Sequence, residues 1–182
     1  GQGDIEWSAV AVRGDDTQAI IKATEGATVT DVNLARNAHK AAAAGLPVSY
    51  YHFGRPDLGE PLPLADARQE AAYFLTTIAG LPMPAELTFA SGRTAAVWLD
   101  LEKPIARWAE IDGLRWVREF LNVVEKQYPV GLYTSRAWLE AEVTPDPDSM
   151  TNLLVRPDGT KRALWIAKYG INDGNVPDRT VY

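Results

Sequence analysis

Short apolar segments rich in β-forming residues alternate along the chain with longer segments whose apolar residues recur at helical spacing. The strand-like segments cover 18–23, 46–53, 95–102, 130–134 and 163–169. The helix-like segments cover 5–12, 33–44, 65–79, 113–127 and 135–142, with Gly45 and Asp112 as a C-cap and an N-cap. Because strands joined by helices of this length are parallel neighbours with right-handed crossovers, the pattern predicts an α/β fold.

Polar residues gather at the carboxyl ends of these strands, which favours a β/α barrel within the α/β class. No Gly-x-Gly-x-x-Gly or phosphate-loop pattern opens a helix, so a nucleotide-binding fold lacks its main signature. Five strands do not close a barrel, and we therefore expect an irregular TIM-like barrel that is incomplete in this chain. A length of 182 residues predicts a single domain over 1–182. The stretches 57–63 and 82–94 are predicted to be irregular, and 144–161 a polar surface excursion.

Composition excludes several classes of function. The net charge of −6 argues against a nucleic acid or an anionic membrane as partner, because both require a basic surface. The chain has no Cys, and its two histidines, His39 and His52, are too few and too far apart to indicate a metal site. It also has no apolar run of about 18 residues and no signal peptide. We expect no metal, no cofactor, no nucleic-acid partner and no membrane insertion.

Two carboxylates end the apolar segment 95–102, whose continuation is barred by Pro104. Side chains alternate across a strand, so Asp100 and Glu102 share one face with Cα atoms roughly 6–7 Å apart. This spacing suits glycoside hydrolysis, in which one acid protonates the leaving oxygen and a second carboxylate stabilises charge or activates a nucleophile. The alternative is that both acids are merely exposed at a strand end, or that one of them caps the next segment.

Five ordered motifs give the chain a specific resemblance. They are Lys22-Ala23-Thr24-Glu25-Gly26, Tyr51-His52-Phe53, Leu99-Asp100-Leu101-Glu102, Gly131-Leu132-Tyr133-Thr134 and Trp165-Ile166-Ala167-Lys168-Tyr169. Together they resemble the glycoside hydrolase family 25 lysozymes, the N-acetylmuramidases that cut bacterial peptidoglycan on an irregular β/α barrel. Family 18 enzymes also have an Asp-x-Glu strand end, but their pattern requires acids where this chain has Ala95 and Trp98.

The chain also departs from the family pattern. The resemblance places a Gly-Ile-Asp-Val-Ser strand before residue 1, and a Trp-Gln-Tyr strand with a further acid after Tyr182. It therefore implies that two barrel strands and up to two active-site acids are absent. Either the sequence is a fragment of a longer enzyme, or it is a natural reduced version with another role.

The resemblance implies that Glu102 is the general acid and that Asp100 positions the N-acetyl group of the substrate. Two close carboxylates also resist ionising together, so one of them is expected to hold its proton to higher pH. The predicted substrate-binding residues are Glu25, Tyr51, His52, Tyr133, Trp165 and Tyr169. For the aromatic residues, core packing is an equal alternative. Glu25 and His52 are chosen because polar groups at strand ends need a partner or a substrate.

Two nearby residues are expected to be structural, with Lys22 as a partner of Glu25 and Trp98 filling the barrel interior. Three classes of function remain open. The first is a muramidase acting on peptidoglycan glycan strands outside the cell or at the cell wall, as a remodelling enzyme or a phage-type lysin. The second is a glycan-binding pseudoenzyme, and the third is a structural module on the same scaffold.

Overall fold

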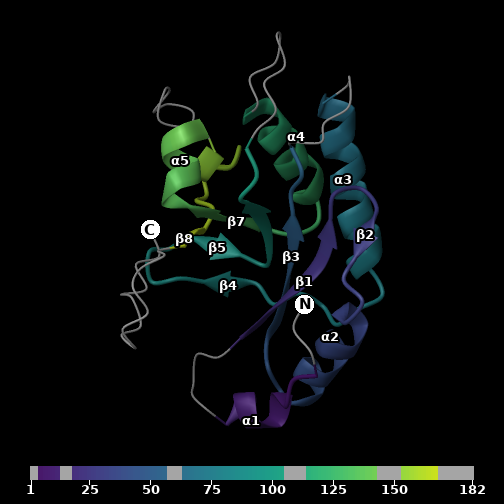
Figure 1. Ribbon diagram of the computed structural model, residues 1–182. Coiled ribbons are helices and arrows are strands. Elements are labelled where there is room, and N and C mark those ends of the chain that lie inside the picture. The colour runs from purple at the N-terminus through teal and green to yellow at the C-terminus, as the bar shows by residue number, and fades with distance from the viewer. Residues whose placement is uncertain (1–3, 13–17, 57–62, 105–113, 143–152, 168–182) are drawn as a thin grey trace.

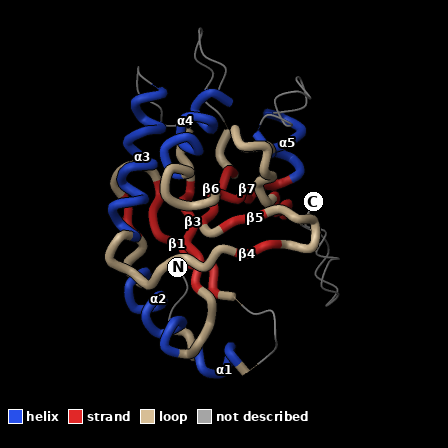
Figure 2. Tube along the Cα trace, turned by 180° about the vertical axis from the view of Figure 1, so that it is seen from behind, coloured by secondary structure: helices blue, strands red, loops and turns tan. Residues whose placement is uncertain are grey.

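The computed structural model describes residues 4–12, 18–56, 63–104, 114–142 and 153–167. Its centre is a six-stranded sheet in the order β2-β1-β3-β6-β7-β8. Most of these strands are labelled in Figure 1, and β6 is labelled in Figure 2. The strands are β1 (Ala19–Glu25), β2 (Val29–Thr30), β3 (Val48–Phe53), β6 (Val97–Leu101), β7 (Val130–Ser135) and β8 (Leu164–Ala167). Only β2 is antiparallel to its neighbour in this sheet. The predicted α/β class is confirmed, and over the described residues the sheet is open, with β2 and β8 at its edges.

Five helices accompany the sheet in the described part of the chain. They are α1 (Trp7–Ala11), α2 (Leu34–Ala43), α3 (Pro63–Ile78), α4 (Leu114–Val124) and α5 (Arg136–Glu142). Helices α3 and α4 lie side by side, whereas α1 lies at the opposite end of the molecule from α4 and α5 (Figures 1 and 2). All five predicted helical segments are present. The predicted cap Asp112 lies outside the described residues, whereas Gly45 follows α2 with a left-handed φ of 79°.

The face of the sheet that packs against α3 and α4, which we call the helix face, carries the main hydrophobic core. Alternation along each strand brings Tyr50, Leu99 and Leu132 to this face, where they are buried together with Phe74 of α3 and Phe120 of α4. Burying each large side chain of this kind stabilises the fold by about 1.5–3 kcal/mol. The helix face therefore provides most of the rigidity on which the opposite face depends.

A hairpin in the stretch predicted to be irregular forms β4 (Leu87–Thr88) and β5 (Thr94–Ala95). The Phe89 N–H donates to the Arg93 carbonyl at 2.9 Å, and Gly92 adopts a φ of 71° in the connection. These strands have only two residues each, which is too short for alternation to reveal them in the sequence.

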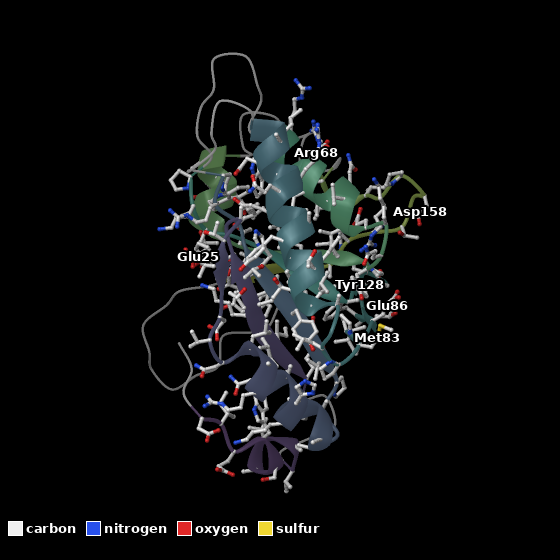
Figure 3. The ribbon with its side chains drawn as sticks, turned by 90° about the vertical axis from the view of Figure 1, so that its right-hand side faces the viewer. Glu25, Arg68, Met83, Glu86, Tyr128 and Asp158 are labelled. Atoms are coloured by element: carbon white, nitrogen blue, oxygen red, sulfur yellow. The ribbon has the colours of Figure 1, made fainter. Side chains whose placement is uncertain are left out.

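The predicted polar excursion at 144–161 is described from residue 153, and over 155–161 every residue except Arg156 is exposed, as expected. Leu153, Arg156 and the following Arg162 are almost fully buried and anchor this segment. Both guanidinium groups bind the carboxylate of Glu125, the residue that follows α4, with Arg156 Nε at 2.9 Å and Arg162 Nε at 2.6 Å from its Oε1. Breaking a buried pair by removing one partner costs about 3–5 kcal/mol, so this cluster holds the segment against the sheet. Asp158 of the same segment lies across the molecule from Glu25 (Figure 3).

No helix within the described residues has the length and apolar character needed to cross a membrane.

Candidate active site

One row of side chains crosses five parallel strands on the face opposite the helix face, which we call the site face. The register pairs Glu25 with Phe53, Phe53 with Asp100, Asp100 with Tyr133, and Tyr133 with Trp165. Register-paired residues of a parallel sheet project to the same side, so these five side chains form a continuous line. The row lies near the carboxyl ends of the strands, where α/β folds place their chemistry.

Asp100 lies at the centre of this row and is 8% exposed. Its backbone carbonyl accepts the Gly54 N–H at 2.9 Å, whereas its side-chain Oδ1 is buried and has no hydrogen-bond partner among the described residues. The pKa of Asp100 is raised from 3.8 to about 7, chiefly by burial and also by the negative charges of Glu102 and Glu25, against the opposing charge of Lys22. At neutral pH the carboxyl group is therefore present in both protonated and ionised forms.

Glu102 follows the last residue of β6 and is exposed. Its charge acts on both Asp100 and Tyr51, which places the two carboxylates and the phenol within electrostatic range of one another. The structure thus brings together the two acids that the sequence singles out, one of them buried and the other open to solvent.

Glu25 ends β1 and is held by two cations. Lys22 Nζ lies 2.7 Å from its Oε2 and Arg55 Nη1 lies 3.0 Å from its Oε1. The hydrogen bond from Lys22 is the largest influence on Glu25 and lowers its pKa, with a further contribution from Arg55. Lys22 also lies 5.1 Å from the centre of the Phe53 ring, and its expected pairing with Glu25 is present. Figure 3 shows Glu25 at the side of the molecule away from Asp158.

Aromatic rings continue the row toward the β8 edge. Tyr133 and Trp165 meet edge to face with centroids 5.0 Å apart, and Trp165 meets Trp98 in the same way at 5.9 Å. Trp165 remains 42% exposed, whereas Trp98 is 3% exposed and packs on Phe89 of the hairpin. Trp98 thus fills the interior of this face as expected, and Trp165 offers a ring surface to solvent.

Tyr51 lies one step nearer the amino ends of the strands and pairs in register with Lys22 and Trp98. Burial, with a smaller contribution from the charges of Asp100, Asp31, Glu102 and Glu25, raises the pKa of its phenol to about 12. Tyr51 is therefore a neutral hydroxyl beside the acids at every pH relevant to the site.

His52 is a correction to the predicted set, because the structure does not bring it to the site face. Its side chain is fully buried on the helix face and stacks on Phe120 with centroids 4.8 Å apart. Burial lowers its pKa to about 3, so the imidazole is neutral. Successive side chains of a strand point to opposite faces, so Tyr51 and His52 could not both line one surface.

Tyr169, the remaining predicted residue, lies outside the described residues. The sequence reasoning did not select Phe53 or Asp31. Alternation alone could have identified Phe53, because it lies two residues after Tyr51 on the same strand. Asp31 gives no such signal, because it follows β2, a strand of only two residues, which is too short for alternation to show which side chains share a face.

The arrangement suits acid–base chemistry on a sugar. A buried carboxyl group with a raised pKa lies beside an exposed one, as in sites that separate the acid from the charge-stabilising role. A ring surface next to them can stack on the C–H face of a pyranose. Among the described residues, no cluster of three or more His, Asp or Glu side chains could hold a metal ion.

Comparison with known proteins identifies the family. The family model for glycosyl hydrolases family 25 matches residues 1–180. An autolytic lysozyme of Clostridium acetobutylicum is 27% identical over 178 residues, covering 97% of this chain and 45% of the relative. Lysozyme M1 of Streptomyces globisporus is 27% identical over 183 residues, covering 97% of this chain and 54% of the relative. The chain thus spans about half the length of the curated relatives it matches.

Solved structures agree on the fold. The bacterial lysozyme from Streptomyces coelicolor superposes with a TM-score of 0.65 at 23% identity, covering 97% of this chain and 74% of that one. A family GH25 lysozyme from Aspergillus fumigatus gives a TM-score of 0.64 at 22% identity, covering all of this chain and 80% of that one. With a family model that matches almost the whole sequence, this chain belongs to the glycosyl hydrolases family 25.

Proposed function

We propose that this chain is a catalytic domain over residues 1–182 that hydrolyses the β-1,4 bond between N-acetylmuramic acid and N-acetylglucosamine in peptidoglycan. The observation that carries the proposal is Asp100, a buried carboxyl group with an unpartnered Oδ1 and a pKa of about 7 beside Glu102. A buried polar atom without a partner is costly, and it persists where a ligand supplies the missing hydrogen bond.

The two acids divide the work in this proposal. Glu102, exposed at the strand end, donates its proton to the glycosidic oxygen as the bond to the leaving sugar breaks. Asp100 in its ionised form accepts a hydrogen bond from the N–H of the substrate's acetamido group through Oδ1. A charged acceptor makes a stronger hydrogen bond than a neutral one, so Asp100 holds the acetyl group where it can assist at the anomeric carbon.

Other side chains of the site face bind the glycan. Trp165 and Tyr133 offer apolar surface at one end, and Tyr51 and the clamped Glu25 offer polar groups at the other. Tyr169 keeps the same predicted role as an aromatic wall. Glycan strands of bacterial peptidoglycan are the proposed partner, which puts the protein's place of action outside the cell or at the cell wall. A curated relative carries the name autolytic lysozyme, in keeping with this substrate.

The first experiment measures the release of reducing ends from purified peptidoglycan by the wild type, by Glu102→Gln and by Glu140→Gln. Glutamine is nearly isosteric but has no proton to donate, so Glu102→Gln is expected to lower kcat by about 10²–10⁴-fold. Glu140 is an exposed carboxylate on α5, paired with Arg136 at 2.6 Å, and its variant is expected to keep full activity. Near-normal turnover by Glu102→Gln would exclude it as the acid.

A substrate with an activated aryl leaving group separates the two possible roles of Asp100, because its glycosidic bond breaks without a proton donor. If Asp100 acts as an ionised acceptor, Asp100→Asn loses activity on this substrate as well as on peptidoglycan, and the wild-type kcat/KM profile has a limb near pH 7, where this carboxyl group titrates. If Asp100 itself were the acid, Asp100→Asn would keep its activity on the activated substrate. A wild type that binds the glycan strands but releases no reducing ends would instead favour a glycan-binding protein.

A further inference from the structure

A buried hydrogen-bonded pair lies on the helix face directly behind the site row. His52 Nε2 lies 2.7 Å from Glu70 Oε2 on α3, and His52 Nδ1 lies 2.8 Å from Thr24 Oγ1 on β1. His52 and Glu70 are 0% and 1% exposed, so neither can touch a substrate. A buried carboxyl group costs free energy unless its oxygens accept hydrogen bonds, so the groups that donate to Glu70 are informative about its role.

Glu70 reaches the site through residues 53–55, which are the last residue of β3 and the two residues after it. The Arg55 N–H donates to Glu70 Oε2 at 3.2 Å. The Gly54 N–H donates to the Asp100 carbonyl at 2.9 Å, and the Phe53 carbonyl accepts the Gly26 N–H at 3.2 Å. This turn therefore ties the ends of β1 and β6 together, and Glu70 ties the turn to α3.

The same turn also fixes the charge nearest to Asp100 from β1. Arg55 carries the guanidinium group that binds Glu25, and Thr24, which bonds His52, immediately precedes Glu25. Two routes thus lead from the buried pair to Glu25, one through the Arg55 backbone and one through the β1 backbone. A Cβ at Gly54 would lie 3.3 Å from Leu99 Cδ1 and 3.4 Å from Trp116, so the turn has little room to shift.

We propose that His52 and Glu70 are positioning residues, which fix the 53–55 turn and through it hold Asp100 and Glu25 in their places on the site face. The inference rests on the proposed function where it is tested by kcat/KM, but the titration of Asp100 tests it independently of that function. Neither residue touches the sugar, and each acts only through the backbone of the turn.

The charges around Asp100 make the role measurable. Glu102 on its own element, Lys22 and Glu25 on β1, and the hydroxyls of Tyr51 and Tyr133 on the neighbouring strands lie beside it. Burial and the charge of Glu25 both raise the pKa of Asp100. Loosening the turn admits water and lets Glu25 move away, so both influences weaken and the pKa moves down toward 3.8.

The test uses the full chain with Glu70→Met, Glu70→Gln and the double variant His52→Phe/Glu70→Met. Methionine has a similar length and removes the hydrogen bonds to His52 and to the Arg55 N–H, whereas glutamine keeps an oxygen for the Arg55 N–H. The double variant keeps a folded core, because a phenylalanine ring can stack on Phe120 and Phe74 as the imidazole does. Tyr50→Phe is the matched control, since it removes one buried hydrogen bond, to the Pro82 carbonyl at 2.8 Å, from the same strand and face.

We expect kcat/KM on peptidoglycan to fall about 10- to 100-fold in Glu70→Met and in the double variant, because small displacements of reacting groups have effects of this size. In both variants, the limb of the kcat/KM profile that Asp100 produces should move to lower pH. The titration of Asp100, followed by carboxyl-carbon NMR, should move in the same direction. Glu70→Gln should restore most of the activity, and Tyr50→Phe should move neither readout.

A folded double variant with wild-type kcat/KM and an unmoved Asp100 titration would overturn the proposal. An inactive wild type would refute the proposed function alone, because the NMR titration still decides whether Glu70 holds Asp100 in place.

Discussion

Two buried carboxyl groups lie on opposite faces of the same sheet, and they differ in what they touch. Glu70 on the helix face is 1% exposed, and its Oε2 has both His52 and the Arg55 N–H as partners. Asp100 on the site face is 8% exposed, and its Oδ1 has no partner among the described residues. Among the described residues, the Glu70 oxygen has its hydrogen-bond partners, whereas the Asp100 oxygen is left with an acceptor site that a ligand can use.

This difference distinguishes a buried acid that supports a site from one that works in it. Burial alone does not, because both groups are removed from water. Saturated hydrogen bonds rigidify their surroundings, and an unpartnered oxygen stores a cost that a ligand can relieve.

Replacing Asp100 by asparagine should stabilise the protein while impairing turnover. The folded-state pKa of about 7 lies above the ordinary value of 3.8, so ionising Asp100 in the folded protein costs up to about 4 kcal/mol. Below pH 3.8 Asp100 is protonated in the folded and the unfolded protein and costs no stability. As the pH rises from 3.8 to about 7 the unfolded state loses this proton first, so the free energy of unfolding falls. We therefore expect Asp100→Asn to unfold at a higher denaturant concentration than the wild type at pH 8.

The same comparison at pH 3.5 is the control, because Asp100 is then protonated in the folded wild type and the difference should shrink. The loss of turnover is measured as the release of reducing ends. A variant that is less stable than the wild type at pH 8 would contradict the view that the orphaned oxygen carries a cost.

Gly131 tests how tightly the site face is packed beneath its acids. A Cβ there would lie 2.7 Å from both Cε3 and Cζ3 of Trp98 and 2.9 Å from Ala95 Cβ. Trp98 is wedged between Phe89 and Trp165, so it cannot move away freely. We expect Gly131→Ala to lower the free energy of unfolding by about 1–3 kcal/mol, as overpacking does.

Gly80 provides the control for this variant, because a Cβ there meets nothing within 4 Å and its φ is not in the left-handed region. Gly80→Ala should be neutral, or stabilising by up to about 1 kcal/mol through the unfolded chain. Equal stability of the two variants in a urea titration would show that Trp98 yields and that this face is loosely packed.

The sequence predicts the parallel strands and the helices because these depend on periodicity. All five strand-like segments appear in the sheet, and the apolar spacing of 113–127 matches the buried stripe of α4, from Leu114 to Val124. The two-residue strands β4 and β5 carry too few positions for a period, and the buried role of Arg156 depends on Glu125, which is 31 residues away. Long-range polar pairing of this kind leaves no local pattern.

Within the site, alternation predicts the face and the register predicts the neighbours. Asp100 and Tyr133 follow this rule, because they are paired across β6 and β7. The prediction of His52 as a site residue follows from its polar chemistry, although its position in the strand directs it to the opposite face from Tyr51. Its partner, Glu70, lies on a helix whose position the alternation along a strand does not predict. The face to which alternation directs a side chain is therefore a stronger guide to a site at a strand end than the type of residue.

The smallest predicted effect concerns Trp165, the exposed end of the aromatic row. Its ring meets Tyr133 and Trp98 edge to face, but it is 42% exposed, so Trp165→Ala should lower the free energy of unfolding by only about 1 kcal/mol. If the ring stacks on a sugar, the same variant should raise KM for peptidoglycan about 3- to 10-fold with kcat unchanged. The reason is that the ring would bind the substrate and the transition state equally well. Trp165→Phe keeps a ring and should recover most of the lost affinity. A KM equal to that of the wild type in Trp165→Ala would mean that this ring serves only to cover Trp98, and the row would then end at Tyr133.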